Sequence, residues 1–96
     1  MFPVKLAIIG GGVIGRRHAY AITKAEHANL VAISDVADSG RQLAEEMKVP
    51  LYADFRVLLD QEDIDGVIVS TPTEDHFQPT IAALETGRHV LVEKPM

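Results

Sequence analysis

The sequence of 96 residues contains no cysteine and no tryptophan, and only three phenylalanines and two tyrosines. The absence of cysteine excludes disulfides, thiolate metal sites and a cysteine nucleophile. No apolar run approaches the roughly 20 residues that a membrane-spanning helix needs, so no membrane association is expected. The apolar share of 47% is nevertheless typical of a globular chain. The length allows one domain, because domains usually run to about 100–150 residues.

Basic residues are also few. The net charge of −5 argues against a nucleic-acid binder. The first 25 residues nevertheless contain four basic residues and no acidic one. Such a locally positive end suits a small anionic ligand better than a polymer, although these side chains can equally form a solvated helix face. No spacing typical of metal ligands stands out, so no metal is predicted.

Signals for export are missing as well. Lys5 interrupts the first apolar stretch, and no cleavage-site pattern precedes the glycines that follow. Arg16 and Arg17 are followed by polar residues rather than by the apolar region of a twin-arginine signal. A cytoplasmic location is therefore expected.

Short apolar runs alternate with helical patterns along the chain, an order typical of a parallel α/β sheet. Strands are predicted over residues 4–9, 30–34, 51–53, 66–70 and 89–92. Helices are predicted from residue 13 to about 25, from Asp38 or Ser39 as the cap to before Pro50, around 55–59, and from about 77 to Gly87. The last helix is expected to place Phe77, Thr80, Ile81 and Leu84 on its inner face.

A glycine motif, Gly10-x-Gly12-x-x-Gly15, joins the first strand to the first helix. Gly10 would make the tight turn, Gly12 would let a pyrophosphate approach the backbone, and Gly15 would allow close packing of helix on strand. Val13 and Ile14 open the helix, whose free N–H groups and dipole favour phosphates. Because the motif follows a strand and opens a helix, it predicts dinucleotide binding.

Asp35 stands twenty residues after the last glycine of the motif, at the end of the second strand. A carboxylate there can accept hydrogen bonds from the adenosine ribose, and it would repel a 2′-phosphate. NAD is therefore expected rather than NADP, although Arg41 is close enough in sequence to reach the adenosine edge. The alternative is an aspartate that only caps a helix or forms a turn.

Together these patterns predict a three-layer doubly wound sheet of the Rossmann type. Its strand order would be 3-2-1-4-5, with the ligand at the switch point between the first and fourth strands. A sixth strand is usual in this fold, and the predicted strands stop before it. Residues 1–96 are therefore expected to be a dinucleotide-binding domain truncated before that strand.

Two further segments follow strands at the same sheet edge. Ser70, Thr71 and Pro72 end the fourth strand, and His76 could face the cleft or lie on a helix surface. Thr71 with Glu74 also resembles a helix-capping box.

The second of these segments, Glu93-Lys94-Pro95, ends the fifth strand. Lys94 could give a proton to a substrate oxygen during hydride transfer, with Glu93 fixing the lysine or a cofactor ribose.

Taken in order, these motifs resemble the Gfo/Idh/MocA family of NAD(P)-dependent oxidoreductases, over the whole chain. The resemblance implies that Lys94 is catalytic and lies beside the nicotinamide and the substrate. It implies that Glu93, Thr71, Pro72 and His76 line the nicotinamide side, and that the Lys94–Pro95 bond can be cis. It also implies a sugar, cyclitol or related polyol as substrate.

Members of that family continue for some 200 further residues, which form an α+β substrate domain and usually the interface of a homo-oligomer. That domain is expected to be absent from these 96 residues. Two alternatives to an oxidoreductase domain stay open. One is a non-catalytic nucleotide-binding module, and the other is a fragment that self-associates through the exposed edge of its fifth strand.

Overall fold

The computed structural model of the chain describes residues 4–71 and 77–92. Five strands alternate with four helices: β1 (Val4–Ile9), α1 (Val13–Lys24), β2 (Ala28–Ser34), α2 (Asp38–Met47), β3 (Leu51–Tyr52), α3 (Phe55–Gln61), β4 (Gly66–Val69), α4 (Phe77–Glu85) and β5 (His89–Val92). Within the described ranges, no helix is both long and apolar enough to cross a membrane.

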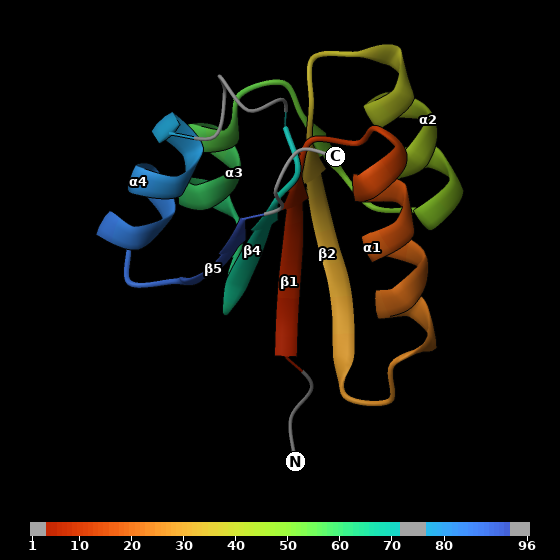
Figure 1. Cartoon of the computed structure of the whole chain (residues 1–96), viewed down its shortest axis with the longest axis horizontal. Coiled ribbons are helices and arrows are strands. Elements are labelled where there is room, and N and C mark those ends of the chain that lie inside the picture. The colour runs from red at the N-terminus through yellow and green to blue at the C-terminus, as the bar shows by residue number, and fades with distance from the viewer. Residues whose placement is uncertain (1–3, 72–76, 93–96) are drawn as a thin grey trace.

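The strands form one parallel sheet in the order β3-β2-β1-β4-β5. Helices α1 and α2 cover one face, and α3 and α4 cover the other (Figure 1). The predicted three-layer α/β fold and its strand order are thus confirmed. The main difference is that β2 begins two residues earlier than predicted, because Ala28 and Asn29 pair with the start of β1.

The pairing of β1 with β2 contains a register shift. Leu6 lies opposite Leu30, whereas Ala7 lies opposite Ala32, so Val31 is an extra residue in β2. Side chains of a strand alternate between faces, and an extra residue reverses that alternation beyond it. Leu30 accordingly packs on the α1 side of the sheet, whereas Val31 and Ala32 both pack on the α3 side.

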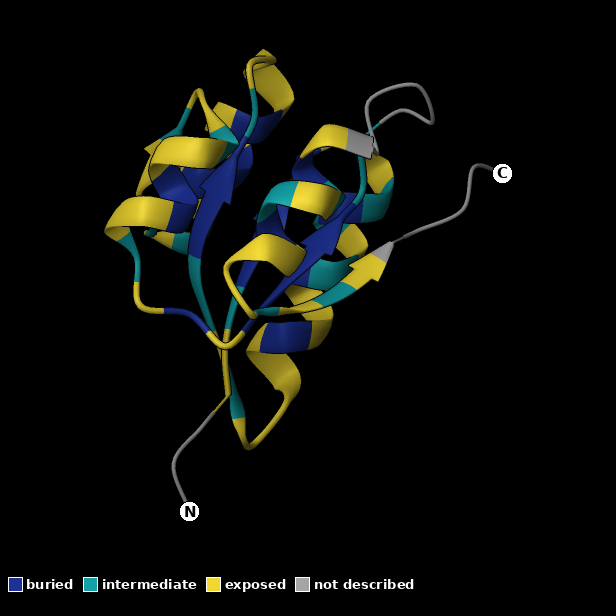
Figure 2. Cartoon of the chain, turned by 90° about the vertical axis from the view of Figure 1, so that its left-hand side faces the viewer, coloured by how far each residue is buried: buried dark blue, intermediate teal, exposed yellow. Residues whose placement is uncertain are grey.

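Apolar side chains form a core on each face of the sheet, and the buried sheet lies between helices whose outer surfaces are exposed (Figure 2). The core on the α1 side consists of Ile8, Ala19, Ile22, Ile33, Leu43, Ala44 and Ile68. The core on the α3 side consists of Ala7, Ile9, Ala32, Leu58, Leu59, Ile64, Val67, Val69 and Ala83. The central strands are covered on both sides, as their continuous apolar runs predict.

Helix α4 buries only part of the predicted inner face: Thr80 is half-buried, with a buried hydroxyl oxygen. Ala83 is fully buried and Pro79 is buried, whereas Ile81 is 39% and Leu84 55% exposed. The prediction of an inner face containing Ile81 and Leu84 is therefore wrong. Apolar residues occur on both sides of this helix, and the small side chain of Ala83 lets the backbone approach the sheet closely. The side chain of Phe77 lies outside the described part.

The start of α2 also differs from the prediction. Its cap residue is Ala37, and no side chain caps the helix, so the expected caps Asp38 and Ser39 are both wrong. Instead, the carboxylate of Asp35 accepts a hydrogen bond from the backbone N–H of Ala37 at 3.2 Å. The residue that follows β2 therefore also fixes the start of α2.

The predicted glycine end of α4 is confirmed. Gly87 has a φ of 79°, and its N–H donates to the carbonyl of Leu84 while the N–H of Arg88 donates to that of Ala83. This pair of bonds is the Schellman arrangement that satisfies the last carbonyls of a helix.

Candidate functional site

Three of the four segments singled out by sequence lie together at the carboxyl edge of the sheet, and the fourth, residues 93–95, lies outside the described part. The N–H of Gly10 donates to the carbonyl of Ser34 at 2.7 Å, and the N–H of Ser70 donates to that of Ile9 at 2.8 Å. These bonds continue the sheet for one residue beyond β1 and β4. The glycine loop is therefore held between the end of β2, which precedes Asp35, and the end of β4.

Two glycines of the motif have no room for a side chain. Gly10 has a φ of 101°, and a Cβ atom there would lie 2.8 Å from backbone atoms of Ser70 and Thr71. A Cβ atom on Gly15 would overlap the carbonyl oxygen of Gly10. The loop thus turns tightly at its start, and α1 packs directly against that turn.

Gly12, in contrast, lies in the open. It is the cap residue of α1, and a Cβ atom there would meet nothing within 4 Å. No side chain caps α1 and its first turn contains no acidic residue, whereas Asp54 caps α3 by accepting from the N–H of Arg56 at 2.9 Å. The first N–H groups of α1, from Val13 onwards, therefore offer an uncompensated positive end to an anion.

Asp35 is hydrogen-bonded to the glycine loop. Its Oδ2 accepts from the N–H of Gly11 at 2.8 Å, and its side chain is half-buried. A Cβ atom on Gly40, in the first turn of α2, would overlap the same side chain. The acid thus lies between the glycine loop and α2.

Sequence reasoning missed Gly11 and Gly40. A signal was available for Gly40, because a glycine inside a helix costs about 1 kcal/mol relative to alanine and so indicates a packing constraint.

A salt bridge spans the first turn of α2. Arg41 donates to Asp38 at 3.0 Å, and their side chains are 60% and 84% exposed. The carboxylates of Asp35 and Asp38 and the guanidinium of Arg41 therefore lie together around the start of α2. This distribution leaves a net negative charge beside the expected ribose position.

Ser70 contacts the loop from the other side. Its hydroxyl donates to the carbonyl of Gly10 at 2.6 Å, and Thr71 follows it, half-buried. The structure therefore brings together the glycine loop, Asp35, Ser70 and Thr71. The other predicted site residues, Pro72, His76, Glu93 and Lys94, and the expected cis bond before Pro95, lie outside the described residues.

Helices α1 and α2 are tied together beside the site. Glu46 accepts from Arg16 at 2.7 Å and from the hydroxyl of Tyr20 at 2.8 Å. The hydrogen bond from Arg16, with that from Tyr20, lowers the pKa of the Glu46 carboxyl below its ordinary value. The contact links the helix that begins at the glycine loop to the helix that begins beside Asp35.

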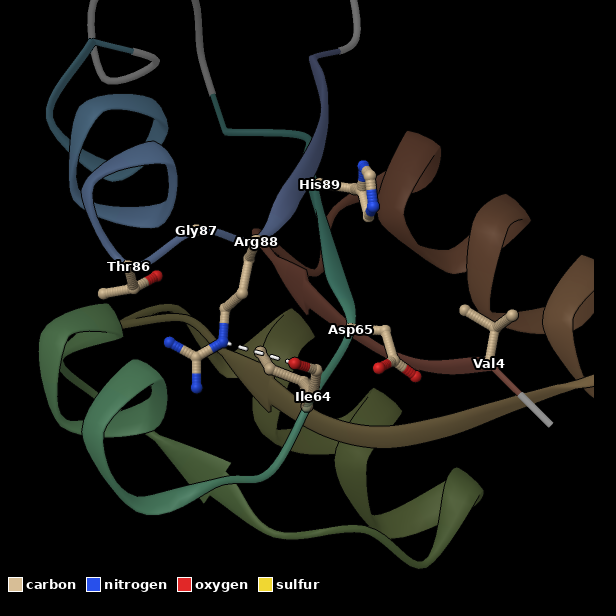
Figure 3. A pocket seen from close by; sticks show the side chains of 7 residues that line it. All are labelled: Val4, Ile64, Asp65, Thr86, Gly87, Arg88 and His89. Carbon is tan, nitrogen blue, oxygen red and sulfur yellow. Dashed lines mark hydrogen bonds between the residues drawn. The ribbon is translucent and has the colours of Figure 1, made fainter. Parts of the chain in front are cut away.

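A pocket of about 520 Å³ lies at the opposite, amino edge of the sheet (Figure 3). Its lining consists of Val4, Ile64, Asp65, Thr86, Gly87, Arg88 and His89. Arg88 donates to the backbone carbonyls of Glu62 at 3.0 Å and Ile64 at 3.4 Å, which secures the loop before β4. The size would suit a small molecule, but ligands of open α/β sheets bind at the carboxyl edge.

Comparison with known proteins identifies relatives by sequence. The chain is 36% identical over its whole length to 2,7-anhydro-N-acetylneuraminate hydratase of Mediterraneibacter gnavus, of which it covers 25%. It is 33% identical to inositol 2-dehydrogenase of Klebsiella pneumoniae, with 97% of this chain and 29% of that protein aligned. The chain thus spans little more than a quarter of the length of these relatives.

A solved structure agrees in backbone as well as in sequence. Scyllo-inositol dehydrogenase from Lactobacillus casei, with bound cofactor NAD(H) and scyllo-inositol, superimposes with a TM-score of 0.89 at 35% identity. The alignment covers 97% of this chain and 28% of that one. Residues 4–96 also match the sequence model of the Gfo/Idh/MocA proteins, described as an oxidoreductase family with an NAD-binding Rossmann fold. With its glycine loop, Asp35 and strand order in place, the chain belongs to this oxidoreductase family.

Proposed function

We propose that this chain binds NAD at the carboxyl edge of its sheet, as the cofactor-binding part of an oxidoreductase acting on a sugar, cyclitol or related polyol. The observation that carries the proposal is the hydrogen bond between the Gly11 N–H and the Asp35 carboxylate. It brings a ribose acceptor next to a glycine loop that opens an uncapped helix. These are the two parts that a dinucleotide site of this fold requires.

The pyrophosphate would bind over Gly12. The open space around this residue lets an anion approach the backbone, and the N–H groups of Gly12, Val13 and Ile14 are placed to donate to it. The partial positive charge at the start of α1 adds to their effect.

The adenosine ribose would bind at Asp35. A carboxylate offers about four acceptor positions, and two of those of Asp35 are used by the N–H groups of Gly11 and Ala37. The remaining positions suit the 2′- and 3′-hydroxyls. A 2′-phosphate would face this charge and that of Asp38, so NAD is favoured over NADP.

The nicotinamide would lie beyond β4 and β5. When bound, it supplies the position that accepts or donates a hydride. We propose that Thr71, Pro72, His76 and Glu93 border it, and that Ser70 binds the cofactor indirectly, through the glycine loop. Lys94 would then act as the acid or base that exchanges a proton with the substrate hydroxyl.

The substrate domain is proposed to lie outside these 96 residues, because the relatives are more than three times as long. The working protein is proposed to be a cytoplasmic homo-oligomer. An exposed Leu91 on β5, which in the described part pairs only with β4, is compatible with association at that edge.

Calorimetric titration with NADH, NADPH and adenosine monophosphate tests the cofactor assignment. We expect saturable binding of NADH and at least about tenfold weaker binding of NADPH, since one opposed charge contact is worth about 1.4 kcal/mol or more. Asp35→Ala should abolish that preference. The matched control is Asp65→Ala, which removes a carboxylate that accepts from the N–H of Lys5 at 2.8 Å, at the amino edge.

The control should bind NADH as the unchanged chain does. A folded chain, verified by circular dichroism, that binds neither NADH nor NADPH would overturn the proposal. Equal affinity for the two dinucleotides would overturn the role of Asp35.

A further inference from the structure

The peptide group between Gly10 and Gly11 is held at both of its polar ends. Its carbonyl accepts from the hydroxyl of Ser70 at 2.6 Å, and its N–H donates to Asp35 at 2.8 Å. In a trans peptide the C=O and N–H groups point in opposite directions, so Ser70 and Asp35 bind the same peptide group from opposite sides. Asp35 directly follows β2, and Ser70 directly follows β4.

We propose that Ser70 is a positioning residue for the phosphate-binding loop, which it orients through the Gly10 carbonyl. This inference rests on the proposed function, because the loop matters only if it binds a dinucleotide. Ser70 lies beneath the loop, where its hydroxyl is engaged by the backbone. It therefore differs from Thr71, which we place at the nicotinamide side.

The loop needs these hydrogen bonds to keep one conformation, because it contains three consecutive glycines, residues 10–12. Glycine loses more conformational freedom on ordering than any other residue, and Gly10 must keep a φ of 101°. A hydrogen bond that is partly shielded from water is electrostatically stronger than one in water, and the bond from Ser70 to Gly10 is part-buried. The hydroxyl of Ser70 thus favours the one loop conformation that delivers the chain into α1.

The packing of Gly15 supports the same reading. A Cβ atom there would overlap the Gly10 carbonyl oxygen and lie 3.0 Å from the Ser70 Oγ. The carbonyl is therefore enclosed by β4 on one side and by α1 on the other. Rotation of the Gly10–Gly11 peptide would change the direction from which α1 starts, and with it the aim of the N–H groups that we assign to the pyrophosphate.

The test compares ligands with and without the pyrophosphate. Adenosine, ADP and NADH are titrated into the chain and into Ser70→Ala, Ser70→Thr and Thr86→Ala. Thr86 is the matched control, because its hydroxyl donates to the carbonyl of Ala83 at 2.7 Å, far from the loop. The amide resonance of Gly11, followed by nitrogen-15 NMR, reports the loop in the free protein.

For Ser70→Ala we expect about three- to tenfold weaker binding of ADP and NADH, the loss typical of one hydrogen bond. Adenosine binding should stay within about twofold, because Asp35 remains. The Gly11 resonance should shift in Ser70→Ala and return towards its original position in Ser70→Thr, which keeps a hydroxyl. Thr86→Ala should leave all three affinities and the Gly11 resonance unchanged.

Two outcomes would overturn the inference while leaving the proposed function intact: unchanged ADP and NADH affinity in Ser70→Ala, or an equal loss for adenosine and ADP. If the unchanged chain binds no NADH, the proposed function fails, and the inference fails with it. If Ser70→Ala does not fold, Ser70→Thr decides. Retained affinity and an unshifted Gly11 resonance support the inference, and weakened ADP binding by a folded Ser70→Thr overturns it.

Discussion

Single residues at the start of α2 set the charge that a cofactor would meet. Asp35 contributes one carboxylate beside Gly40, and Asp38, the first residue of α2, contributes a second. Arg41 is the one cation in this turn, and its guanidinium is directed to Asp38. Discrimination between NAD and NADP is thus expected to depend on three charged groups rather than on Asp35 alone.

Asp38→Asn should therefore shift the ratio of NADPH to NADH affinity about fivefold towards NADPH, which corresponds to about 1 kcal/mol. The change removes a negative charge and releases Arg41 to meet a 2′-phosphate. Both side chains are largely exposed, so a larger effect is not expected. Titration of the two dinucleotides measures the ratio. Arg41→Ala in the same background should reverse the shift, and an unchanged ratio in Asp38→Asn would contradict the assignment.

At the scale of elements, the sheet and the glycine turn followed from sequence because their patterns are local. Short apolar runs between helical patterns predicted each strand, and the spacing of Gly10, Gly12 and Gly15 predicted the turn. Contacts between distant segments could not be predicted in this way. The bond from Gly11 to Asp35 depends on how the loop lies against α2. The inner face of α4 was misjudged because apolar residues occupy both of its sides.

Helix α4 gives a direct test of that correction. Ala83→Leu should lower the free energy of unfolding by about 1–3 kcal/mol, because no space exists at this buried position. Leu84→Ala should change it by no more than about 0.5 kcal/mol, because this side chain is mostly in solvent. Urea denaturation of both variants measures the difference. The reverse ranking would mean that Leu84, and not Ala83, faces the sheet.

The contact between α1 and α2 predicts a pH dependence. Because the pKa of Glu46 is lowered in the folded chain, its contribution to stability is fully present above the unfolded pKa of about 4.3 and is lost as the pH falls through the folded value. The melting temperatures of the unchanged chain and Glu46→Gln should differ at pH 7 and converge below about pH 4. Glu45→Gln, an equal charge change on the same helix, should show no such convergence. A difference that persists at low pH would contradict the role of Glu46.

At the scale of the whole molecule, the two edges of the sheet are built differently. The carboxyl edge holds the glycine loop, Asp35 and Ser70. The amino edge holds the pocket of about 520 Å³, beside which Lys5 pairs with Asp63 at 2.9 Å and Arg88 donates to the carbonyls of the loop before β4. Substitutions at the amino edge can therefore serve as controls for ligand binding at the carboxyl edge.

The edge strand β5 is relevant to the proposed association of this chain with further copies of itself. Leu91 is 51% exposed on β5, and exposed edge strands pair readily with other chains. We expect the average mass from analytical ultracentrifugation to rise with concentration, and Leu91→Lys to reduce this rise. Val57→Lys, which changes a 45% exposed residue on α3, is the matched control and should associate unchanged. A monomer at all concentrations would contradict association through β5.

The register shift in β2 has a consequence for how this sheet tolerates insertions and deletions over evolution. With Val31 as an extra residue, the alternation of β2 is reversed before the strand reaches Asp35. Deletion of Val31 would restore the regular alternation, because Ala32 and Ile33 already lie opposite Ala7 and Ile8, and Asp35 would keep its place beside the glycine loop. Related chains should therefore be able to lack this one residue of β2 and still place their acid beside the glycine loop.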